Sequence, residues 1–113
     1  MNTAIAPKVE ITLDRPRRLL FDFNAKVAFE EATGASTFDP KTFNLSSKVI
    51  RALLWAGLLH ENPMLTLQEA GAMITRQNER EVSKKVFEAW RLSLPELKEE
   101  AGTEAAANPP RKN

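Results

Sequence analysis

Cysteine is absent from the 113 residues, and histidine occurs only once. Without cysteine the chain has no disulfide, no thiol nucleophile and no thiolate metal ligand. His60 and Glu61 begin like a zinc-protease helix, but Met64 stands where the second histidine is required. One imidazole cannot build an ordinary zinc site, and no serine lies in a local nucleophile signature. The sequence therefore predicts a protein that is not an enzyme and needs neither a metal nor a cofactor.

Clustered glycines, an excess of charge of one sign and long apolar runs are also missing. The four glycines are scattered, so no phosphate-binding loop is expected. The 16 basic and 15 acidic residues leave a net charge of +1, whereas a dedicated nucleic-acid binder usually has a marked basic excess. No apolar run reaches the about 20 residues that a bilayer requires, and the first residues lack a secretory signal pattern. We expect a cytoplasmic protein that binds neither nucleic acid nor membrane.

The most apolar stretch of the chain, residues 47–61, predicts a central helix. Ser46 or Ser47 can cap its amino end by accepting a hydrogen bond from a free backbone N–H. Pro63 closes the other end, because it disfavours helical geometry at Asn62 and cannot donate a helix hydrogen bond. Apolar residues occupy nearly every side of this helix, and such a helix is normally buried on nearly every side. Either the small domain wraps it, or a partner covers what the domain leaves exposed.

A β-hairpin is predicted over residues 8–23, where apolar and polar residues alternate in two runs separated by a turn at residues 14–17. An isolated hairpin is marginal in water, so its apolar face needs support, for which the central helix is the obvious candidate. That face would carry Val9, Ile11, Leu13, Phe21 and Phe23. Three arginines, Arg15, Arg17 and Arg18, lie at the tip; a solvated turn is favoured there over a contact with phosphate or an acidic partner.

Further helices are predicted at residues 25–33, 67–75 and 79–94 from their apolar periodicity and their end signals. Asn24 can cap the first of these and Gly34 suits the left-handed position just beyond it. Thr66 and Glu69 have the spacing of a capping box for the second. The pattern weakens around residues 75–78, where a bend or a new helix start is possible.

The expected fold is α+β and mostly helical, with the N-terminal hairpin packed on a bundle of about four helices. Residues 1–97 would form a single globular domain. Residues 98–113 are charged, small or proline and contain no aromatic or β-branched aliphatic side chain. They have nothing to bury, so we expect a disordered C-terminal tail.

The sequence favours a function in binding another protein through its surface rather than in catalysis. Trp55 and Leu58 lie in the sector of the central helix that begins with Lys48 and Arg51, where polar residues would be expected. Two interpretations stay open: the rest of the domain covers this sector, or it is a protein interface, since aromatic residues and arginine are enriched in interface cores. Phe87 and Trp90 on the last helix pose the same question, with the core favoured. The candidate partner-binding residues are Arg51, Trp55, Leu58, Phe87 and Trp90.

Two groups of residues stand out by their order and spacing. The first is Phe21-Asp22-Phe23-Asn24-Ala25 leading into Phe29-Glu30-Glu31-Ala32-Thr33-Gly34. The second is Arg51-Ala52-Leu53-Leu54-Trp55-Ala56-Gly57-Leu58-Leu59-His60-Glu61, then Pro63, Leu65-Thr66-Leu67 and Glu69-Ala70-Gly71. Together they resemble the small tail assembly chaperones of long-tailed phages and gene transfer agents, and the match spans roughly residues 9–74.

This resemblance implies a non-enzymatic protein that coats the tape measure protein and helps tail tube subunits polymerise around it. It also implies self-association along that client, in the bacterial cytoplasm during phage assembly. Two alternatives stay open: a small DNA-binding regulator with a helix-turn-helix between residues 67 and 94, and a tail tube or other scaffold protein. The near-neutral charge disfavours the first, and the single clear hairpin disfavours a strand-rich tube subunit.

Overall fold

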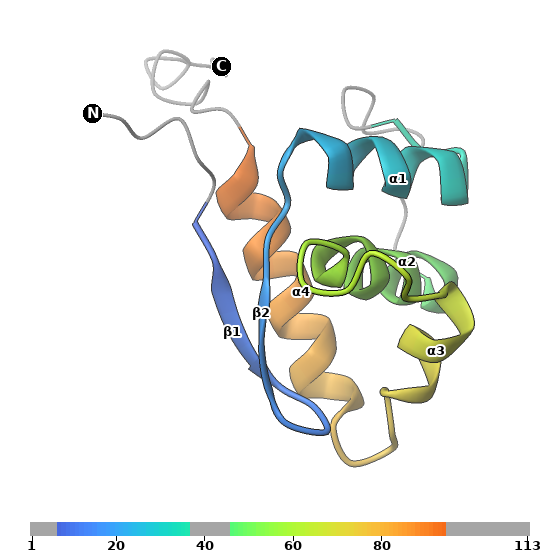
Figure 1. The fold of residues 1–113 in the computed structure, drawn as a ribbon. Helices are drawn as coiled ribbons and strands as arrows, with labels where there is room; N and C mark the ends of the chain where they lie inside the picture. Colours follow the sequence, from blue (N-terminus) through green and yellow to red (C-terminus); the bar gives the residue numbers. More distant parts are fainter. Residues whose placement is uncertain (1–6, 37–45, 95–113) are drawn as a thin grey trace, which may run out of the picture.

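The computed structural model describes residues 7–36 and 46–94. Its elements are β1 (Val9–Thr12), β2 (Pro16–Leu19), α1 (Phe23–Thr33), α2 (Ser47–Leu58), α3 (Leu67–Ala72) and α4 (Glu79–Ser93). Helix α2 is central and contacts α1, α3, α4 and β2, while β1 packs on α4 (Figure 1). The predicted α+β class is confirmed: a hairpin packs against four helices. The tail predicted at residues 98–113 lies outside the described residues.

The hairpin is shorter than predicted. Strands β1 and β2 pair antiparallel, with Val9 opposite Leu19, so the second strand ends four residues before Phe23. The chain leaves the sheet because the Leu20 N–H donates to the carbonyl of Gly57 in α2, at 2.9 Å. Asp22 then caps α1 by accepting from the Ala25 N–H, so the predicted cap at Asn24 is wrong. Phe23 is 71% exposed on α1 and does not belong to the apolar face of the hairpin.

Arg17 is the one tip arginine that is not solvated. It lies opposite Ile11 in the hairpin and is only 8% exposed. Its Nε and Nη2 donate to the two carboxylate oxygens of Asp14, at 2.8 and 3.0 Å, and Nη1 lies 3.9 Å from Glu61 Oε1. The hydrogen bond from Arg17 lowers the pKa of the Asp14 carboxyl. Arg15 and Arg18 are exposed, as predicted for a solvated turn.

The helix ends confirm most of the predicted caps. Ser46 Oγ accepts from the Val49 N–H at the start of α2, and Gly34 has φ of 79° just after α1. Thr66 and Glu69 form the capping box that opens α3. These signals are local in sequence, since each cap bonds a backbone group within four residues.

Two helices end earlier than predicted. Helix α2 stops at Leu58 instead of residue 61, and its last carbonyl accepts from both Glu61 and Asn62 in a turn. Helix α3 stops at Ala72 instead of residue 75. The Asn78 side chain accepts from the Thr75 N–H at 2.7 Å and donates to the Met73 carbonyl at 3.0 Å. These bonds satisfy the backbone groups of a bend at the place where the periodicity weakens.

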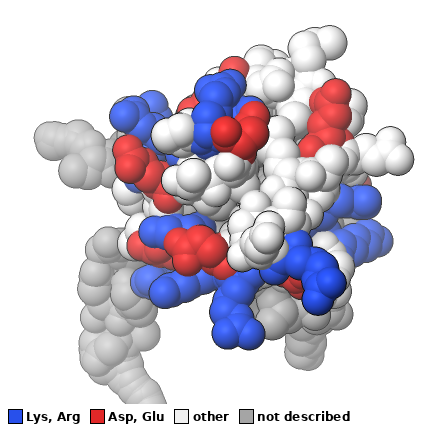
Figure 2. All heavy atoms as spheres, turned by 90° about the horizontal axis from the view of Figure 1, so that it is seen from below, with Lys and Arg blue, Asp and Glu red and all other residues white. Residues whose placement is uncertain are grey.

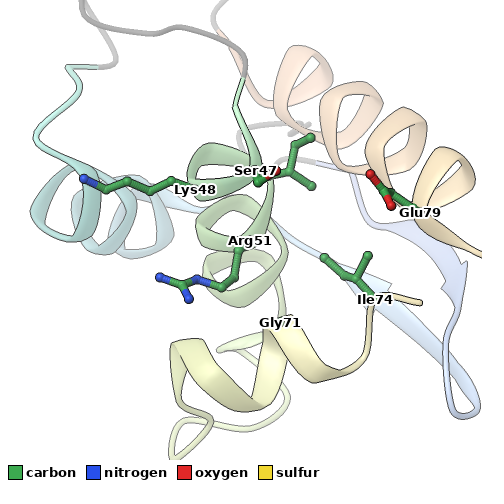
Figure 3. Close-up of a pocket in the computed structure, with 7 residues that line it drawn as sticks. Ser47, Lys48, Arg51, Gly71, Ile74 and Glu79 are labelled. Carbon is green, nitrogen blue, oxygen red and sulfur yellow. The ribbon is translucent and has the colours of Figure 1, made fainter. Parts of the chain in front are cut away.

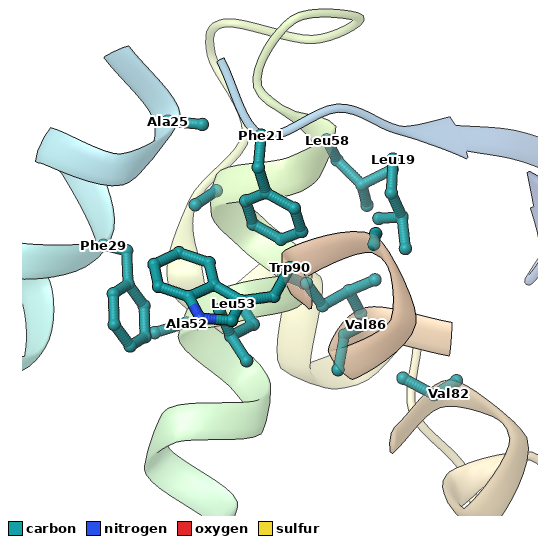
Figure 4. Packing of buried hydrophobic residues seen from close by; sticks show 14 of the residues in the cluster. Leu19, Phe21, Ala25, Phe29, Ala52, Leu53, Leu58, Val82, Val86 and Trp90 are labelled. Carbon is teal, nitrogen blue, oxygen red and sulfur yellow. The ribbon is translucent and has the colours of Figure 1, made fainter. Parts of the chain in front are cut away.

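The core is centred on an aromatic cluster between α1, α2, α4 and the end of the hairpin (Figure 4). The Trp90 ring lies 5.5 Å from that of Phe21, edge to face, and 5.1 Å from that of Phe29. Such pairs add about 1 kcal/mol each beyond the apolar area they bury. Around them lie the other large side chains with no or almost no exposed surface: Leu19, Leu53, Leu54, Leu58, Val82 and Val86.

Gly57 marks the closest approach between α2 and the hairpin exit. A Cβ at this position would lie 3.0 Å from Leu19 Cδ2 and 3.1 Å from Phe21 Cζ, inside ordinary packing distance. Beyond the helix end, His60 Nε2 lies 2.8 Å from the Arg18 carbonyl, and the Arg18 N–H donates to Glu61 at 3.3 Å. The absence of a side chain at position 57 therefore allows the hairpin to close on the C-terminal end of α2.

Candidate protein-binding groove

Two predicted partner-binding residues are part of the core. Leu58 has no exposed surface, because the hairpin closes over this end of α2, so of the two interpretations left open the one in which the rest of the domain covers this sector holds for Leu58. Trp90 is 7% exposed and belongs to the aromatic cluster. Phe87 is half-buried and packs against the edge of the core. A partner could reach Leu58 or Trp90 only if the domain opened.

Trp55 is half-buried and supports the connection between α2 and α3. Its indole Nε1 donates to the carbonyl of Leu65 at 2.8 Å, and its ring packs against the core cluster. Leu65 itself is buried. The indole thus fixes the segment that leads into the capping box at Thr66, and through it the position of α3.

Arg51 is exposed, and its aliphatic stem covers Gly71 of α3. A Cβ built at Gly71 would lie 2.9 Å from Arg51 Cδ and 3.4 Å from Cγ. The missing side chain at position 71 lets the stem of Arg51 lie against α3. Of the five residues predicted to bind a partner, Arg51 is the only one that lines a cavity given by the described residues.

An open groove of about 500 Å³ lies where the N-terminal half of α2 meets α3 and the start of α4. The half-buried side chains of Ile50 and Ile74 pack against the core cluster and give the groove its apolar floor. Figure 3 shows Lys48 and Arg51 on the α2 side of the groove and Glu79 on the opposite side. The lining residues are Ser47, Lys48, Ile50, Arg51, Gly71, Ile74 and Glu79.

Among the described residues, the charged side chains that line the groove form no ion pair with one another or with a neighbour. The ion pairs given for the described part of the chain join Arg17 to Asp14 and Glu61, and Lys85 to Glu88. None of them includes a groove residue. Helix α2 has no acidic residue in its first turn, so Lys48 adds to the positive end of the helix dipole. The α2 side of the groove is therefore electropositive, beside an apolar floor.

Among the lining residues that the structure describes, Ser47 carries the one hydroxyl and none is a histidine. Across residues 7–36 and 46–94, no cluster of histidine, aspartate or glutamate has the geometry to hold a metal ion. Likewise, none of the helices drawn in Figure 1 from these residues has both the length and the apolar composition to cross a bilayer.

Sequence reasoning found only Arg51 and missed the rest of the groove. Ile50, Ile74 and Glu79 come from three separate segments of the chain. The one available signal was Gly71, a glycine inside a helix with no turn to explain it, which often indicates a close approach by another group.

The described residues have other exposed features besides the groove. A second depression of about 420 Å³ lies on the hairpin side of the bend between α3 and α4, and most of its lining is polar. Phe23 and Val27 are exposed one turn apart on α1, and Met64 is 84% exposed beyond α2. On the face seen in Figure 2, acidic and basic side chains are interspersed with uncharged surface.

Comparisons of the chain with protein-family models, curated proteins and solved structures gave no match.

Proposed function

We propose that this protein is a non-enzymatic phage tail assembly chaperone that binds the tape measure protein and assists polymerisation of the tail tube. The proposal starts from the family resemblance of residues 9–74. The structural observation that carries it is the groove between α2, α3 and α4, which has an apolar floor and a rim whose charges form no ion pair within the described part of the chain. Such a groove can receive an apolar side of a client segment.

The size of the groove favours weak binding by each copy. Burial of two leucine side chains on its floor gains about 2 kcal/mol each. Association costs at least about 4 kcal/mol in lost translational and rotational freedom. A single groove would therefore hold a client only weakly, and tight coating requires several copies that bind along one client or associate with one another. This requirement agrees with the self-association that the resemblance implies.

The competing functions have less support. In a helix-turn-helix the N-terminal residues of the second helix contact DNA, but the first turn of α4 carries Glu79 and Glu81. Those carboxylates would face the phosphates with charge of the same sign. A tail tube subunit needs many strands for its ring, and the described residues contain one two-stranded sheet.

Co-expression with the tape measure protein of the same genome tests the proposal. We expect the wild-type chain to keep that protein soluble and to co-purify with it. Ile74→Asp should reduce co-purification several-fold, because it places a charge on the groove floor. Met64→Asp is the matched control, since Met64 is exposed and outside the groove. No co-purification by the wild-type chain, or equal loss in both variants with normal circular dichroism, would contradict the proposed site.

A further inference from the structure

We infer that the groove binds an amphipathic helix whose acidic side chains lie along the edge that faces Lys48 and Arg51. This inference rests on the proposed function and names the chemistry of the client segment. It follows from what forms the walls of the groove, from what forms its floor, and from the charges that remain unpaired at its rim.

The walls of the groove require an occupant that satisfies its own backbone. The lining residues that the structure describes belong to α2, to α3, to the bend after α3 or to the first turn of α4. Within a helix most backbone N–H and C=O groups bond to one another and only the first-turn N–H groups stay free, so this described lining offers no alternating row of partners to an added strand. An extended segment would lose its hydrogen bonds to water there without replacement. A helix keeps them within itself, and presents apolar side chains at i, i+3, i+4 and i+7 to a floor such as Ile50 and Ile74.

The rim decides the charge of the occupant. Lys48 and Arg51 share the α2 side, and neither has an ion pair within the described residues. The stem of Arg51 also lies against Gly71 of α3. A docked helix would take water from both cations, which costs free energy unless carboxylates replace that water. A basic edge would instead be repelled from this side, and Glu79 disfavours a second acidic edge across the groove.

Two designed peptides of about 15 residues test the inference, both with one leucine stripe at helical spacing. One carries glutamates along one edge of the stripe, and the other carries lysines at the same positions. Fluorescence anisotropy at low salt measures the dissociation constant of each with the full chain. We expect the acidic peptide to bind about tenfold more tightly, and the double variant K48E/R51E to lower its affinity at least about tenfold.

The matched control is K84E/R91E, which changes the net charge equally at two exposed positions of α4 outside the groove. It should leave the affinity within about twofold. Gly71→Ala gives a second measurement without any change of charge, because its Cβ displaces the stem of Arg51 and should lower the affinity of the acidic peptide alone.

Equal affinity of the two peptides, or equal loss of affinity in both double variants, would overturn the inference of an acidic edge. If neither peptide binds but the tape measure protein still co-purifies, the helical occupant is wrong and the proposed function survives. If the tape measure protein does not co-purify either, the proposed function fails.

Discussion

The two ends of α2 have opposite surroundings. The C-terminal end is apolar, and the hairpin exit closes over Gly57 and Leu58 so that both are buried. The N-terminal end alternates buried Val49 with exposed Lys48 and Arg51, and it opens into the groove. From the sequence, Trp55 and Leu58 in the apolar part of the helix could belong either to the core or to a partner interface. The comparison shows that the surface left open lies at the less apolar end, because elements of the same chain compete for the most apolar part first.

The largest expected loss of stability comes from a change in the aromatic cluster around Trp90. Trp90→Ala removes the ring that lies between Phe21 and Phe29 and leaves a cavity. We expect the free energy of unfolding, measured by urea denaturation, to fall by about 3–5 kcal/mol. Leu92→Ala on the same helix, at an exposed position, should cost less than about 0.5 kcal/mol. Similar losses in the two variants would mean that the aromatic cluster around Trp90 contributes no more to the stability of the domain than an exposed side chain does.

A pair of glycine substitutions compares the two ends directly. Alanine gains about 1 kcal/mol over glycine inside a helix. In Gly57→Ala the new methyl group meets packed Leu19 and Phe21 and should cost about 1–3 kcal/mol, which outweighs that gain. In Gly71→Ala it meets only the flexible, exposed side chain of Arg51, so stability should be unchanged or higher. Thermal unfolding of both variants measures the difference, and a more stable Gly57→Ala would show that the closed end has room.

Trp55 lies between the two ends, and a smaller effect is expected there. Trp55→Phe keeps most of the apolar ring but loses the hydrogen bond from Nε1 to the Leu65 carbonyl. We expect a loss of about 1 kcal/mol in the free energy of unfolding. If Trp55→Phe is as stable as the wild type, the indole does not fix the entry to α3.

The smallest effect concerns the acid sensitivity of the closed end. Arg17 lowers the pKa of Asp14 from its ordinary value of 3.8. Because the pKa of Asp14 is lower in the folded state, its carboxylate contributes stability that is complete above the ordinary value of 3.8. This contribution is lost as the pH falls through the folded-state pKa. The Tm of Asp14→Asn should therefore lie slightly below that of the wild type at neutral pH, and the gap should close below about pH 4. Glu10→Gln, on β1 and without an ion pair among the described residues, should show no such closing gap.

What the sequence predicted well was local. Ser46, Gly34 and the Thr66–Glu69 box act on backbone groups within a few residues, so their patterns are sufficient to place helix ends. The bend after α3 was also visible as a weak periodicity, although the role of Asn78 in it was not. The two strands and four helices followed from apolar spacing, with errors of a few residues at their ends.

What could not be predicted depends on contacts between distant residues. The second strand ends where Leu20 meets Gly57, and Arg17 is buried because Asp14 and Glu61 surround it. The side of Leu58 on the helix is visible in the sequence, but the hairpin that covers it is not. The groove brings together residues from position 47 to position 79, so no single stretch encodes it. The role as a tail assembly chaperone stays a prediction for the same reason: it depends on a second molecule.

The placement of the two tryptophans gives the molecule separate optical reporters. Trp90 is enclosed by aromatic rings, whereas Trp55 keeps part of its indole in contact with water. Fluorescence emission from Trp90 would change when the packing of the core is lost. Emission from Trp55 would change when a partner binds near the junction of α2 and α3. When one tryptophan at a time is replaced by phenylalanine, fluorescence spectra would distinguish a client that binds the folded domain from one that opens it.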